Sequence, residues 1–170
     1  MTYRNTQTRD RIIRIAAGLF GSHGWQATTL DDILSAAGIT KGAFYHYFTG
    51  KQALCEASIN QAVSEVQWLI RSIDFQQSAR NSSDSISLWI EAFNRSEQRT
   101  WFRFLVRLSS DSTESYPSIH ARLGHFWNEF HRDLLSLCSH NDKTENPIGT
   151  KDLIFRMAGS IVLERYLSEE

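Results

Sequence analysis

The chain has 170 residues, of which 41% are hydrophobic and 22% charged, with 18 basic against 19 acidic side chains. This apolar fraction excludes general disorder, and no apolar run approaches the ~18 residues that a membrane span needs. The two cysteines, Cys55 and Cys138, are far apart, and the polar N-terminus carries no apolar export signal. We therefore expect a cytoplasmic protein that has no structural metal and does not contact a membrane.

The charge is unevenly distributed along the chain. Residues 1–54 contain six Lys or Arg against three Asp or Glu, whereas residues 55–170 contain 12 against 16. A basic head is typical of a protein that meets a polyanion. An excess of three charges is also compatible with chance.

Helical periodicity runs through almost the whole chain, and strand patterns are nearly absent. Apolar residues repeat at intervals of three and four over residues 12–20, and Gly24 suits the left-handed cap that ends this helix. Short helices are predicted at about 29–37 and 40–48, and a helix of more than 20 residues from about 50 to 73.

The second part of the chain alternates helical patterns with polar loops. Helices are predicted at about 84–96 and 98–109, from 117 to 138, and from about 148 to 167. The predicted fold is therefore all-α with about eight helices. A helix-turn-helix head of three helices, residues 1–51, is joined by the long helix to a helical bundle, residues 52–170.

Residues 28–48 are typical of two short helices joined by a turn. Thr29 and Asp32 have the spacing of a capping box, and Gly38 supplies the positive φ that the turn requires. Phe44 and Phe48, four residues apart, form the buried side of the second helix. A corner of this kind also occurs in helical proteins that use it only for packing.

The outward side of the second helix lacks the Glu/Lys mixture of an ordinary exposed surface. It consists of Lys41, Gly42, Ala43, Tyr45, His46 and Tyr47. Small residues permit close approach, and the tyrosines and the histidine offer donors and ring planes. Such a helix fits the major groove of B-DNA, where Lys41 is the best reader of a guanine edge. This cluster favours DNA binding over a packing role.

Residues 9–54 resemble the DNA-binding head of the tetracycline-repressor (TetR) family of bacterial transcription regulators. The resemblance rests on residues 12–20, 24–33, 37–48 and 51–54. It implies a double-stranded DNA partner, with phosphate contacts from Thr29, Tyr47 and Lys51. It also implies that the groove is faced by Lys41, Gly42, Ala43, Tyr45 and His46.

The resemblance also implies a small-molecule effector pocket and a dimer interface within residues 52–170. Candidate pocket residues are the large aromatics Trp68, Trp89, Phe93, Trp101, Phe102, Phe126, Trp127 and Phe130. Pockets are often lined in this way, although most such rings belong to an ordinary core. Candidate dimer residues on the last predicted helix are Ile154, Met157, Ala158 and Ile161. Family members usually carry one further long helix, so the dimer geometry stays open.

These patterns favour a transcriptional regulator over other classes of protein. We expect a ligand-responsive repressor that binds a pseudo-palindromic operator as a homodimer and needs no cofactor. The alternative is a helical partner-binding protein that has kept the head without operator recognition. No Ser/His/Asp, Cys/His or paired-carboxylate arrangement predicts an enzyme, and the histidine spacings match no metal site.

Overall fold

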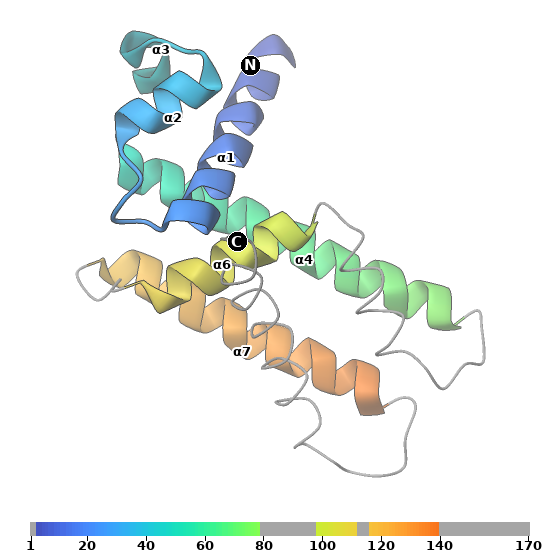
Figure 1. Cartoon of the computed structure of the whole chain (residues 1–170). Helices are drawn as coiled ribbons and strands as arrows, with labels where there is room; N and C mark the ends of the chain where they lie inside the picture. Colours follow the sequence, from blue (N-terminus) through green and yellow to red (C-terminus); the bar gives the residue numbers. More distant parts are fainter. Residues whose placement is uncertain (1–2, 79–97, 112–115, 140–170) are drawn as a thin grey trace, which may run out of the picture. The chain divides into compact units, whose positions relative to one another are not determined.

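The computed structural model of the chain describes residues 3–78, 98–111 and 116–139 (Figure 1). These residues form the helices α1 (Tyr3–His23), α2 (Leu30–Ala37), α3 (Lys41–Tyr45), α4 (Lys51–Ser78), α6 (Gln98–Ser110) and α7 (Pro117–Ser139). No strand occurs among them, which confirms the all-α prediction. None of these helices is both long and apolar enough to span a bilayer. The helices predicted at 84–96 and 148–167 lie outside the described residues.

The start and end of α2 follow from local side-chain chemistry. The hydroxyl of Thr29 accepts a hydrogen bond from the Asp32 backbone N–H at 3.1 Å, and the Asp32 carboxylate accepts one from the Thr29 N–H at 2.8 Å. This is the predicted capping box with Asp in place of Glu. At the other end Gly38 has a φ of 60°, and the Ile39 N–H bonds to the Leu34 carbonyl.

Helix α3 is shorter than the predicted span of 40–48. The Thr40 side chain caps it by accepting a hydrogen bond from the Ala43 N–H at 3.2 Å. It ends at Tyr45 because the Phe44 carbonyl accepts hydrogen bonds from both Tyr47 (2.8 Å) and Phe48 (3.1 Å), which tightens the chain into a turn. Phe44 and Phe48 are both buried, as predicted.

The chain divides into two compact units. The first comprises Met1–Ser64 and Thr100–Leu123, and the second comprises Glu65–Arg99 and Gly124–Glu170. Helices α4 and α7 each contribute to both units. The whole helix-turn-helix thus shares a unit with most of α6 and the beginning of α7. The proposed functional division after residue 51 stays a prediction, because compactness alone does not locate function.

The core of the first unit is built around α1. Helix α2 packs against α1 (Figure 1). The Phe20 ring lies 5.3 Å from Trp25 and 6.0 Å from Phe104, measured between ring centroids, and all three side chains are buried. A Cβ placed on Gly21 would lie 3.3 Å from the Phe104 Cα, so α1 and α6 approach closely there. Burial of each large ring contributes about 2–3 kcal/mol. This packed core supports the helix-turn-helix formed by α2 and α3.

The second unit contains its own aromatic cluster on α7. Phe126 and Phe130 are buried, with ring centroids 5.5 Å apart, and Trp127 lies 4.9 Å from Phe126. Within the same unit, the Gln67 amide donates to the Glu129 carboxylate at 3.2 Å. This bond joins the second half of α4 to α7.

Candidate nucleic-acid interface

The predicted outward residues of α3 and of the turn after it lie on an exposed surface. Tyr45 is 51% exposed, although its ring meets the buried Phe44 ring edge-on at 5.4 Å. Lys41, Gly42 and His46 are also exposed, whereas Ala43 and Tyr47 are half-buried. Tyr45 is therefore supported by a buried ring while about half of it stays exposed. The surface therefore presents donors and small residues together.

Thr29 uses its hydroxyl for the cap of α2. The hydroxyl donates to the Asp32 carboxylate at 2.7 Å and accepts from the Asp32 N–H. The hydrogen bond from the Thr29 hydroxyl is the largest cause that lowers the pKa of the Asp32 carboxyl, followed by the bond from the Thr29 backbone N–H. Any contact of the Thr29 hydroxyl with a phosphate therefore competes with the capping box.

Lys51, at the start of α4, ties this helix to the loop before α2. Its Nζ donates to the carbonyls of Trp25 and Thr28, both at 2.9 Å, and lies 4.3 Å from the centroid of a Trp25 ring. Burial lowers the pKa of this ammonium group. An ammonium has three N–H donors, so at most one is left for a phosphate. Sequence reasoning did not anticipate this second role.

Asp111, just after α6, holds the same loop from another direction. Its Oδ2 accepts a hydrogen bond from the Trp25 backbone N–H, and its Oδ1 lies 3.7 Å from the Arg107 Nε. The Tyr116 ring meets Trp25 edge-on at 5.4 Å. The sequence offers no signal for this contact, because residue 111 stands in a polar break between helices.

Comparison with known proteins identifies the family of the N-terminal segment. Residues 12–58 match the family described as bacterial regulatory proteins, tetR family. The biofilm operon icaADBC HTH-type negative transcriptional regulator IcaR of Staphylococcus aureus is 27% identical over 115 residues, which cover 68% of this chain and 61% of IcaR. A transcriptional regulator of the TetR family from Cytophaga hutchinsonii has a TM-score of 0.75 and 18% identity, over 98% of this chain and 87% of that one. Residues 12–58 therefore form a domain of the tetR family.

A second solved structure is similar to most of the chain. A gamma-butyrolactone receptor (ArpA-like protein) has a TM-score of 0.71 and 25% identity, over 95% of this chain and 82% of the receptor. The curated relatives are matched over less of their length. The chain spans 58% of the mycofactocin biosynthesis transcriptional regulator MftR of Mycobacterium tuberculosis and 61% of IcaR. The matched family segment starts within α1 and contains α2, α3 and the first residues of α4.

The residues predicted for a TetR-type effector pocket are only partly brought together. Phe126, Trp127 and Phe130 form the α7 cluster of the second unit, and Trp68 of the same unit is 61% exposed. Trp101 and Phe102 are buried in the first unit. The residues outside the described part of the chain are Trp89, Phe93 and the dimer candidates Ile154, Met157, Ala158 and Ile161. Among the described residues, no group of three or more His, Cys, Asp or Glu is placed to hold a metal ion.

Proposed function

We propose that this TetR-family protein is a transcriptional repressor that inserts α3 into the major groove of double-stranded DNA. The proposal rests on the exposed surface formed by α3 and the turn after it. This surface is supported from inside by the buried side chains of Phe44 and Phe48. A short helix presented in this way matches the groove in width. The similarity to IcaR, a negative transcriptional regulator, supports repression.

Each residue of this surface has a distinct role in the proposal. Lys41 donates to a guanine edge, and Tyr45 contacts a thymine methyl or a phosphate. Gly42 and Ala43 let the backbone approach the bases. His46 faces the groove as well. Thr29, Tyr47 and Lys51 contact phosphates, in the case of Lys51 with the one N–H that the loop carbonyls leave.

The remainder of the chain supplies dimerisation and control. We place the protein in the cytoplasm as a homodimer on a pseudo-palindromic operator, because protein symmetry then matches operator symmetry. A small-molecule effector binds the second unit beside the α7 aromatic cluster, a role supported by the similarity to a gamma-butyrolactone receptor. Effector binding lowers DNA affinity by favouring a spacing of the two heads that does not fit the operator.

Binding to the upstream region of the gene, followed by fluorescence anisotropy, tests the proposal. We expect sequence-selective binding with a steep salt dependence, since each neutralised phosphate adds about 0.9 to the slope of log K against log salt. Tyr45→Ala should weaken binding to the selected site about 5- to 100-fold. The matched control is Arg132→Ala, an exposed substitution in the second unit, which should change affinity less than twofold. Sequence-indifferent binding would favour the partner-binding alternative.

A further inference from the structure

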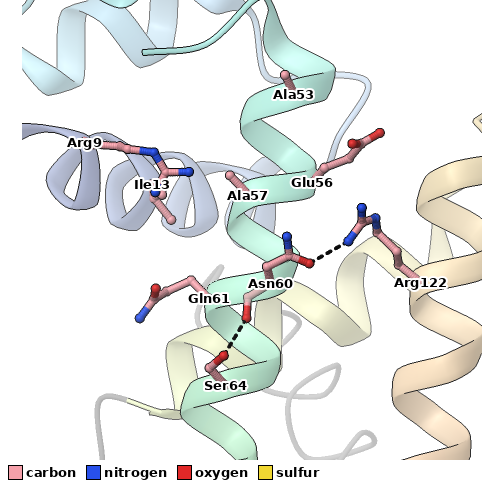
Figure 2. Close-up of a pocket in the computed structure, with 9 residues that line it drawn as sticks. All are labelled: Arg9, Ile13, Ala53, Glu56, Ala57, Asn60, Gln61, Ser64 and Arg122. Carbon is pink, nitrogen blue, oxygen red and sulfur yellow. Dashed lines mark hydrogen bonds between the residues drawn. The ribbon is translucent and has the colours of Figure 1, made fainter. Parts of the chain in front are cut away.

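A polar hollow of about 320 Å³ lies among α1, the first half of α4 and the beginning of α7 (Figure 2). All of its lining residues belong to the first unit. The volume is at the lower end of the range for small-molecule sites. None of the residues proposed above for DNA contact or for the effector lines it. The hollow is therefore a separate feature of the fold.

Two arginines enter the hollow from different helices. Figure 2 shows the Arg9 side chain coming from α1 and the Arg122 side chain from α7, each directed towards α4. Arg122 donates from Nη1 to the Asn60 Oδ1 at 2.7 Å, and the Arg9 guanidinium carbon lies 5.3 Å from the centroid of the Phe48 ring. Each guanidinium carries five N–H donors, so most of these donors have no protein acceptor in the part of the chain described.

Three of the acceptor oxygens around the hollow already receive hydrogen bonds. Oε1 of Glu56 accepts from the Ser118 hydroxyl at 2.7 Å and from the Gln52 amide at 3.2 Å. The two oxygens of Asn60 accept from Arg122 and from the Ser64 hydroxyl, as the dashed lines in Figure 2 show. The guanidiniums of Arg9 and Arg122 are the two cationic groups that line the hollow. A ligand that complements these donors must bring acceptors and negative charge.

We propose that this hollow binds a small dicarboxylate, with one carboxylate on Arg9 and the other on Arg122. Guanidinium groups pair with carboxylates through two parallel N–H···O bonds, and two guanidiniums approaching from different helices suit a ligand that is charged at both ends. The small side chains of Ala53 and Ala57 leave room for the carbon chain that links the two carboxylates of the ligand. Glu56 repels the ligand, which keeps the affinity in the millimolar range.

Isothermal titration calorimetry in the absence of DNA tests ligand binding to the hollow independently of the proposed DNA binding. The probes are acetate, succinate, glutarate and adipate at constant ionic strength. We expect at least one dicarboxylate to bind tenfold more tightly than acetate. Arg9→Gln and Arg122→Gln should each weaken that binding at least tenfold. Arg14→Gln and Arg132→Gln, on the same two helices but away from the hollow, should change it less than twofold.

A space-filling variant provides a second test that leaves both arginines in place. Ala57→Leu should abolish dicarboxylate binding, whereas Ala121→Leu, exposed on α7, should not. Cooperative thermal unfolding of each variant verifies that it is folded. Equal binding of acetate and the dicarboxylates by the unmodified protein would overturn the proposal. Unchanged binding in both Arg→Gln variants would overturn it as well, since the ligand would then sit elsewhere.

Discussion

The backbone N–H of Trp25 donates a hydrogen bond to the Asp111 carboxylate, 86 positions later in the chain. On its other side, the Trp25 carbonyl accepts from the Lys51 ammonium. The loop before α2 is thus held by the residue after α6 and by the first residue of α4. Thr29 follows this loop directly and caps the start of α2. The same contacts therefore position the helix-turn-helix relative to the rest of the first unit.

Removal of the Asp111 carboxylate should destabilise the protein. Asp111→Ala leaves the Trp25 N–H without its acceptor, and loss of a hydrogen bond to a charged group costs about 1–3 kcal/mol. Asp111→Asn keeps an acceptor oxygen and should cost less. The free energy of unfolding from urea denaturation checks both, with Asp10→Ala, an exposed substitution on α1, as a control expected within about 0.5 kcal/mol. Equal stability of Asp111→Ala and the unmodified protein would show that water replaces the carboxylate.

Lys51→Met separates the two roles of this lysine. The substitution keeps an apolar stem over Trp25 but removes the donors to the Trp25 and Thr28 carbonyls, so we expect a loss of about 1–2 kcal/mol in the free energy of unfolding. If Lys51 also contacts a phosphate, the slope of log K for DNA against log salt should fall by about one. If the salt dependence of log K is unchanged while the affinity falls, Lys51 only positions the loop and does not contact a phosphate. Urea denaturation and anisotropy titrations at several salt concentrations provide the two measurements.

The features that sequence predicts well in this chain are those whose partners are local. Thr29 and Asp32 are three residues apart, and Gly38 needs its positive φ for the turn itself, so both could be read directly from the sequence. Lys51 meets carbonyls 23 and 26 residues away, and Asp111 reaches across 86. Neither residue stands in a pattern that distinguishes it from an ordinary charged surface residue. Such contacts depend on how the helices pack, which periodicity does not specify.

Two glycines in α1 should respond oppositely to the same substitution. Within the part of the chain that the structure describes, a Cβ on Gly18 meets nothing within 4 Å outside its own helix backbone. Gly18→Ala should therefore stabilise the protein by about 0.5–1 kcal/mol through the better helix propensity of alanine. A Cβ on Gly21 lies 3.3 Å from the Phe104 Cα and 3.4 Å from the Phe104 backbone nitrogen. Gly21→Ala should therefore not raise the free energy of unfolding. Gly21→Val should destabilise by about 1–3 kcal/mol through overpacking. Urea denaturation of the three variants tests the close approach of α1 and α6, and equal gains at both glycines would contradict it.

The buried Cys55 should make the protein less stable in alkali. Burial raises the pKa of its thiol from 9.0 to about 12. Between about pH 9 and 12 the unfolded chain releases this proton while the folded chain retains it, so the free energy of unfolding falls as pH rises, by at most about 1.4 kcal/mol per pH unit. Below pH 9 the thiol contributes no pH dependence. Urea denaturation at pH 8.5, 9.5 and 10.5 should show a steeper decline for the unmodified protein than for Cys55→Ala, and parallel declines would contradict the assignment.

Gly42→Leu offers the most selective test of the DNA-facing surface. Among the described residues beyond its chain neighbours and its own helix backbone, the one atom within 4 Å of a Cβ on Gly42 is the Thr40 hydroxyl oxygen, at 4.0 Å. The position is also exposed, so the protein itself accommodates a side chain there. Leucine also has the higher helix propensity, so stability should be unchanged or slightly raised. DNA affinity should nevertheless fall at least tenfold, because the isobutyl group keeps the start of α3 away from the base edges. Anisotropy titration and urea denaturation of the same preparation separate the two effects. Lost stability would mean that the side chain disturbs the fold, and unchanged affinity would place α3 outside the groove.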